Sequence, residues 1–160
     1  MKFIIFFLKW ILAAIALIFA HYAISYLLPW PLNNINIIFS AVIISIIGWE
    51  SGASIWLAVL LHFFIELYSI SAFGLILLPS AIGIIFAYWL YIFIFTNRSW
   101  TSAIALVAIA ITVYRILHTG AFIMVENFNK GFNIDWHALL IPYFWELSFT
   151  SALTGLMVFI

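Results

Sequence analysis

The stretch from Trp100 to Val125, WTSAIALVAIAITVYRILHTGAFIMV, decides how this chain folds, because it is long, apolar and interrupted by a single charge, Arg115. A helix needs about 20 apolar residues to cross the roughly 30 Å hydrocarbon core of a bilayer. We therefore predict a transmembrane helix over residues 100–125 with a cation inside it.

Five further apolar runs are separated by short polar or proline-containing segments, such as Pro29-Trp30-Pro31. Their hydrophobicity is continuous rather than alternating, which favours helices over strands. The chain is thus predicted to be a single transmembrane domain, an all-α integral membrane protein with a bundle of six transmembrane helices. The predicted spans are 3–28, 32–48, 53–70, 72–95, 100–125 and 136–160.

The composition supports membrane insertion and excludes several classes of protein. Hydrophobic residues make up 69% of the chain and charged residues 6%, with a net charge of zero, whereas soluble domains carry roughly a quarter charged residues. Without excess Lys and Arg there is no basic face for nucleic acid. The absence of Cys excludes disulfides and thiolate chemistry.

Few charges are left to set the orientation. If the N-terminus is cytoplasmic, Lys2, Lys9 and Arg98 fall inside and only Lys130, in the longest polar stretch between Glu126 and Asp135, falls outside. This agrees with the positive-inside tendency and predicts a multi-pass protein of the cytoplasmic (inner) membrane with both termini cytoplasmic. Tryptophans at predicted span ends fit interfacial anchoring; they are Trp10, Trp30, Trp49, Trp100 and Trp136.

Three charged residues lie inside the apolar runs, namely Glu66, Arg115 and Glu146. A charge in the hydrocarbon costs about 3 kcal/mol or more, so such residues normally face the protein interior and pair. At about 1.5 Å per residue, Glu66 and Arg115 lie about 20 and 22 Å from the same side of the membrane, and Glu146 lies about 15 Å into its span. We predict that Arg115 pairs with Glu66, with Glu146 or with both.

Two histidines accompany these charges, because His62 lies four residues before Glu66 and His118 lies three residues after Arg115. Each spacing places both side chains on one helix face. The five residues form either a hydrogen-bonded cluster that fixes the helix register or a metal or proton site. A guanidinium within the cluster repels a metal cation, so we favour the first alternative and expect no metal and no cofactor.

Small residues four positions apart indicate close helix packing. They form three pairs: Ala16 and Ala20, Gly83 and Ala87, Ser151 and Gly155. The sequence lacks G-x-S-x-G, H-E-x-x-H and a phosphate-binding glycine loop. We therefore expect no catalytic residues and no enzymatic activity; a membrane enzyme handling protons or metal would need the His and Glu residues at ligand distance.

The segment Trp56–Ser69, followed by Ala72-Phe73-Gly74-Leu75, resembles the rod shape-determining protein MreD family. In that family an apolar helix ends in an acidic residue, and a short turn leads to a Gly-Leu that opens the next helix. Glu66 takes the acidic position here and Gly74 the glycine. The proline-rich first loop and the segment Asn33–Asn36 also fit, so the resemblance covers roughly residues 1–118.

The resemblance implies a non-enzymatic scaffold subunit of the bacterial machinery for cell shape and peptidoglycan elongation. Its partners would be membrane lipids and other membrane proteins: MreC-like proteins, the actin-like MreB, and a RodA-like glycosyltransferase with its penicillin-binding partner.

MreD-like chains also resemble the substrate-binding S components of energy-coupling factor transporters, which implies an alternative function in vitamin or metal uptake. Ala16 and Ala20 would then touch the energising subunit, and Glu66, Arg115, His118 and Glu146 would line an outward pocket. An S component needs a cavity of a few hundred Å³ with converging polar groups. A scaffold should have these groups paired with one another.

Overall fold

The computed structural model describes residues 2–50, 52–129 and 135–159, which fold into six α-helices and one short 3-10 helix, with no strand among them. The prediction of an all-helical chain with six helices is confirmed at this level. The elements are α1 (Lys2–Leu27), η1 (Leu32–Asn34), α2 (Ile37–Trp49), α3 (Ala53–Leu67), α4 (Leu77–Phe93), α5 (Trp100–Asn129) and α6 (Trp136–Phe159).

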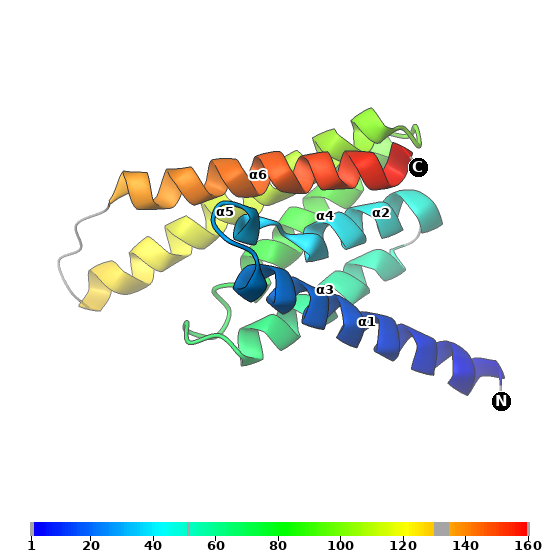
Figure 1. The fold of residues 1–160 in the computed structure, drawn as a ribbon, viewed down its shortest axis with the longest axis horizontal. Coiled ribbons are helices and arrows are strands. Elements are labelled where there is room, and N and C mark those ends of the chain that lie inside the picture. The colour runs from blue at the N-terminus through cyan, green and yellow to red at the C-terminus, as the bar shows by residue number, and fades with distance from the viewer. Residues whose placement is uncertain (1, 51, 130–134, 160) are drawn as a thin grey trace.

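Helix α2 lies at the centre of the bundle, where it contacts all five other helices. Its apolar side chains form much of the core, including Ile38, Phe39, Val42, Ile43 and Ile46, each with no exposed surface. The long helices α5 and α6 run side by side along the molecule, and α5 also packs along α4 (Figure 1). Helix α1 crosses the other side, and its N-terminal end projects from the bundle (Figure 1).

Polar side chains define where three helices begin. Asn36 caps α2 by accepting a hydrogen bond from the backbone N–H of Phe39, and Ser99 accepts one from Ser102 at the start of α5. Asp135 accepts hydrogen bonds from the first turn of α6. Each side chain satisfies backbone donors that a helix leaves unpaired at its N-terminus.

The second and fourth helices differ from the predicted spans. Helix α2 begins at Ile37 rather than at Leu32, because Asn36 caps it, and α4 begins at Leu77 rather than at residue 72. The predicted third span also ends earlier, at Leu67. These three helices therefore have 13, 17 and 15 residues, fewer than the 20 or so expected of a full span.

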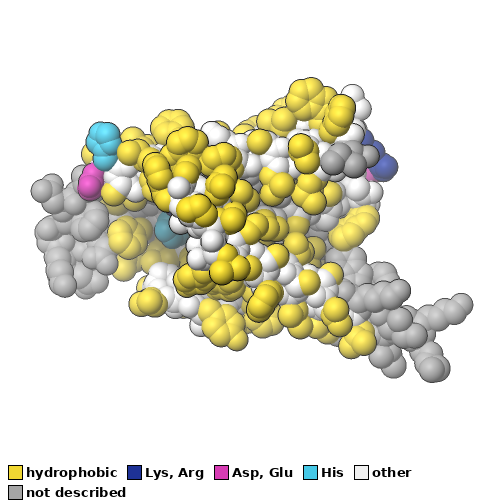
Figure 2. Space-filling model, viewed as in Figure 1, with side chains coloured by type: hydrophobic (Ala, Val, Ile, Leu, Met, Phe, Trp, Pro, Cys, Tyr) yellow, Lys and Arg dark blue, Asp and Glu magenta, His cyan; other side chains and the backbone are white. Residues whose placement is uncertain are grey.

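Within the described residues, α5 is the one helix that by length and hydropathy could cross a membrane on its own, over Trp100–Val125. Shorter apolar helices occupy Ile11–Leu27, Ile37–Trp49, Ala53–Leu67 and Leu77–Phe93. Apolar side chains cover most of the visible surface, and the charged side chains in view lie at its two ends (Figure 2). Exposed examples on four helices include Phe19, Trp56, Trp89 and Phe144.

Most of the charges used to predict the orientation are not described. Residues 130–134 of the polar stretch, which include Lys130, lie outside the described residues. The same holds for the side chains of Lys2, Lys9, Trp10 and Glu126. Arg98 is described, in the connection between α4 and α5, where its Nε donates a hydrogen bond to Glu50 Oε1 at 2.9 Å. Both side chains are more than half exposed. The hydrogen bond from Arg98 lowers the pKa of Glu50 below its ordinary value.

Candidate functional site

Arg115 on α5 pairs with Glu146 on α6, one of the two partners predicted for it. The Arg115 Nε donates a hydrogen bond to Glu146 Oε2 at 2.6 Å, and Nη2 contacts the same oxygen. The Glu146 side chain is 4% exposed and that of Arg115 is 31% exposed. The carboxylate is therefore buried behind the guanidinium, and one edge of the guanidinium is engaged by the ion pair.

Asn36 completes this site from the start of α2. Its Nδ2 donates a hydrogen bond to Glu146 Oε1 at 2.9 Å, and its backbone N–H donates to Thr150 Oγ1, also at 2.9 Å. Both carboxylate oxygens of Glu146 thus have partners, one on α5 and one at the N-terminus of α2. We call this set of four residues, Asn36, Arg115, Glu146 and Thr150, the three-helix polar junction.

Buried hydroxyl groups extend the junction between α2 and α6. Thr154 Oγ1 donates a hydrogen bond to Ser40 Oγ at 2.9 Å, and Ser40 Oγ donates to the Thr150 carbonyl at 3.5 Å. Ser40, Thr150 and Thr154 have almost no exposed surface. The sequence did not predict the role of Asn36 or these hydrogen-bonded hydroxyl groups. The position of Asn36 before an apolar run indicates a helix cap, but nothing local to it identifies a partner on α6.

Glu66 lies elsewhere, so of the alternatives predicted for Arg115 the structure shows pairing with Glu146 and not with Glu66. Its buried carboxylate accepts hydrogen bonds from three backbone N–H groups: Gly74 at 3.0 Å and Ile76 at 3.2 Å, and Leu77 at 2.5 Å. These donors precede and open α4, where the unpaired N–H groups and the helix dipole favour an anion. Gly74 has a φ of 97°, which glycine adopts readily and other residues rarely do. A local turn therefore supplies the donors that Arg115 was expected to supply.

The two histidines do not join the ion pair. Carbonyl oxygens only accept, so the buried His62 donates from Nδ1 to the carbonyl of Ala58, at 2.9 Å. Its ring meets that of Phe39 edge-on at 5.2 Å. His118 is half-buried and packs on the Tyr114 ring at 5.5 Å. Among the residues that the structure describes, no three His, Asp or Glu side chains are grouped so that they could hold a metal ion.

Two of the three small-residue pairs pack against α5. A Cβ on Gly83 would lie 2.8 Å from the Ala110 carbonyl, and a Cβ on Gly155 would lie 2.7 Å from Ile104 Cδ1. Their companions Ala87 and Ser151 are buried. The first pair differs, because Ala16 is exposed and Ala20 only half-buried, so the prediction that this pair packs closely is wrong within this chain.

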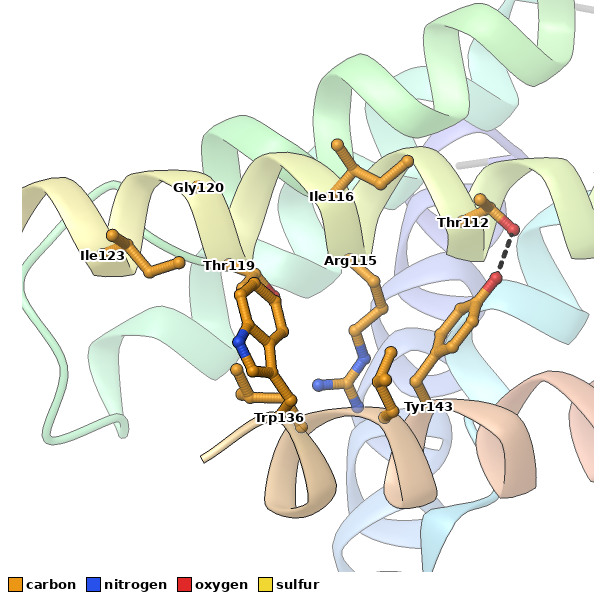
Figure 3. A pocket seen from close by; sticks show the side chains of 10 residues that line it. Thr112, Arg115, Ile116, Thr119, Gly120, Ile123, Trp136 and Tyr143 are labelled. Atoms are coloured by element: carbon orange, nitrogen blue, oxygen red, sulfur yellow. Dashed lines mark hydrogen bonds between the residues drawn. The ribbon is translucent and has the colours of Figure 1, made fainter. Parts of the chain in front are cut away.

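A cavity of about 450 Å³ lies between α5 and α6 beside the ion pair. Arg115 projects across it from α5, between Trp136 and Tyr143 of α6 (Figure 3). A hydrogen bond of 2.9 Å between the hydroxyls of Thr112 and Tyr143 closes its inner end. The remaining wall is formed by Ile116, Thr119, Gly120, Ile123, Leu139 and Leu140.

No protein-family model, no curated protein and no solved structure matches this chain.

Proposed function

We propose that the chain is an integral membrane protein whose six helices are embedded together in the cytoplasmic membrane. Large apolar side chains are exposed on several helices, and a soluble monomer rarely exposes contiguous apolar patches beyond a few hundred Å². The short α2 suits this arrangement, because protein rather than lipid surrounds it. In a membrane, both termini would be cytoplasmic.

We further propose that the protein is a non-enzymatic scaffold subunit of the bacterial cell-elongation machinery, similar to MreD. The observation that carries this proposal is that both interior carboxylates are bound within the fold itself. Glu146 is bound by Arg115 and Asn36, and Glu66 by the backbone that opens α4. Groups that are already paired hold helices in register and are poorly placed to act on a substrate.

The Glu66 cap also gives a physical meaning to the sequence resemblance. The two positions that carry it, the acid at Glu66 and the glycine at Gly74, are joined by a hydrogen bond of 3.0 Å. The pattern of acid, turn and glycine then describes a helix corner that fixes the shape of the protein. A carboxylate held by backbone N–H groups in this way has a structural role, which is compatible with the proposed scaffold function.

The test is affinity purification of the tagged protein in mild detergent from the organism that encodes it, followed by quantitative mass spectrometry. We expect enrichment of MreC-like and RodA-like proteins and the penicillin-binding partner. An equally expressed, unrelated six-helix membrane protein with the same tag is the control. Recovery of the protein in the soluble fraction would contradict the membrane placement. Recovery in the membrane without these partners would contradict the scaffold function alone.

A second candidate function, that of an S component in vitamin or metal uptake, is favoured by the cavity. Its volume of about 450 Å³ falls within the range of small-molecule sites, and Arg115, Thr112 and Thr119 contribute polar groups to its wall. The exposed Ala16 on α1 would be available to an energising subunit. Co-purification of an ATPase and a transmembrane energising subunit in the same experiment would support this function instead.

A further inference from the structure

Gly120, in the wall of the α5–α6 cavity, is not explained by the packing of the chain. A Cβ on Gly83 or Gly155 would collide with a neighbour, whereas a Cβ on Gly120 would meet nothing within 4 Å. Glycine inside a helix is less favourable than alanine, and close contact accounts for it at the first two positions. At Gly120 the chain leaves open space beside a cavity, which is room for a molecule other than the chain.

The polar group that a bound molecule would meet in this cavity is the guanidinium of Arg115. Glu146 engages Nε and Nη2, but a guanidinium carries five N–H donors, and its free end faces the cavity between Trp136 and Tyr143 (Figure 3). The carboxylate lies behind, 4% exposed and with both oxygens bound. The cavity therefore presents hydrogen-bond donors, and the planar fork of Arg suits a phosphate group.

The guanidinium is close to one polar end of the bundle. Trp136 is the first residue of α6 and follows the exposed cap Asp135; Tyr143 is about 10 Å further along the helix. Arg115 lies between these two side chains (Figure 3). Trp side chains concentrate where lipid headgroups meet acyl chains, so the Trp136 end of the cavity would lie at that depth, and the Arg115 side chain reaches toward it from the ion pair with Glu146 deeper in the bundle.

The rest of the cavity is apolar and its rims face outward. Ile123 and Leu139 line it, and the rim residues Ile116 and Leu140 are 66% and 47% exposed. A free anion would gain only the contact with Arg115. A phosphate attached to an acyl chain would gain the Arg115 contact and the apolar walls together.

We propose that the α5–α6 cavity binds one phospholipid, whose phosphate accepts hydrogen bonds from Arg115 and whose acyl chain lies beside Gly120. The charge of the phosphate complements the guanidinium, and the chain complements the aliphatic wall. This inference rests on the membrane placement proposed above, but it does not depend on the scaffold function.

The test uses native mass spectrometry of the full chain in mild detergent with added phosphatidylglycerol. Gly120→Phe fills the cavity with an aromatic ring, and Gly48→Phe is the matched control, because Gly48 is exposed and its Cβ would also meet nothing within 4 Å. The parent and Gly48→Phe should retain one lipid, and Gly120→Phe should bind it at least about tenfold more weakly, because the ring occupies the space of the acyl chain and removes its apolar contacts. Equal retention by all three proteins would overturn the proposal.

Two further measurements separate the phosphate contact from the chain contact. Arg115→Lys keeps a positive charge for Glu146 but removes the forked donor, so it should weaken phosphatidylglycerol binding. A diacylglycerol with the same chains should bind the parent more weakly than the phospholipid and should be insensitive to Arg115→Lys. Equal binding of the two lipids would overturn the role of Arg115. Cell fractionation tests the membrane placement separately, so a membrane protein that retains no lipid contradicts this inference alone.

Discussion

Around Ala110, on the side of α5 that meets α4, backbone and small side chains touch directly, whereas around Arg115, on the side that meets α6, an ion pair lies beside an open cavity. A Cβ on Gly83 of α4 would lie 2.8 Å from the Ala110 carbonyl. Arg115, also on α5, forms an ion pair with Glu146 of α6 next to a cavity of about 450 Å³. The first contact depends on shape and the second on charge, so the two sides should respond differently to substitution.

The largest effect is expected when the ion pair on the α6 side is broken. Glu146→Leu leaves the Arg115 cation unpaired, and loss of one partner from a buried pair costs about 3–5 kcal/mol of stability. The double variant Arg115→Leu/Glu146→Leu should recover most of this loss, because no uncompensated charge remains. Thermal melting in detergent measures both. If the double variant melts no higher than Glu146→Leu, charge does not hold this side together.

The corner that opens α4 should show the next largest effect. Glu66→Gln retains one oxygen but turns an amide N–H₂ toward backbone donors, and loss of hydrogen bonds to a charged group costs about 1.5–3 kcal/mol. The same substitution at the exposed Glu50 is the matched control. A Glu66→Gln protein that melts like the Glu50→Gln protein would show that the carboxylate does not fix the start of α4.

The shape-dependent contact on the α4 side is tested by adding a single methyl group. Gly83→Ala places a Cβ against the Ala110 carbonyl and should cost about 1–3 kcal/mol through overpacking. Gly120→Ala, on the cavity side of the same bundle, should instead gain up to about 1 kcal/mol, because Ala favours helix and its Cβ meets nothing. Changes of opposite sign in the melting temperature would support the difference between the α4 side and the cavity side. A loss of stability in both variants would contradict it.

The smallest effect is expected away from both sides, at the exposed pair of Arg98, in the α4–α5 connection, and Glu50, at the end of α2. Because Arg98 lowers the pKa of Glu50 in the folded protein, the stabilisation is present above the ordinary pKa of the carboxyl group. It is lost as the pH falls through the lowered value. The melting temperatures of the parent and Glu50→Gln should therefore differ slightly at neutral pH and converge in acid. A difference that grows in acid would reverse this assignment.

The sequence predicts the helices well where their ends are marked by polar residues or proline. The starts at Ala53, Trp100 and Trp136 agree with the structure. The exception is α2, whose predicted start precedes the capping residue Asn36 by several residues. The predicted start of α4 is also several residues early, because hydropathy does not distinguish an apolar residue in a turn from one in a helix. Leu75 and Ile76 continue an apolar run, yet they belong to the turn that Glu66 binds.

The candidate site was only partly predictable from the sequence. Helix depth placed Arg115 near two carboxylates, and Glu146 is the one it meets. Depth along the membrane says nothing about which helices are neighbours, so the preference for Glu146 over Glu66 was not predictable. The contact of Asn36 with Glu146 joins residues 110 positions apart, so no local pattern predicts it. The hydrogen bond between Thr112 and Tyr143 joins uncharged hydroxyl groups, which the search for interior charges does not detect.

The bond between Asn36 and Glu146 also constrains how the chain is made. When Asn36 is translated, its partner Glu146 still lies 110 residues further along the chain. The side of α2 that contacts α6 therefore stays uncovered until α6 is synthesised and packs against it. Truncation anywhere before residue 146 removes the Glu146 contact from the central helix, so the bundle can be completed only after α6 has been synthesised.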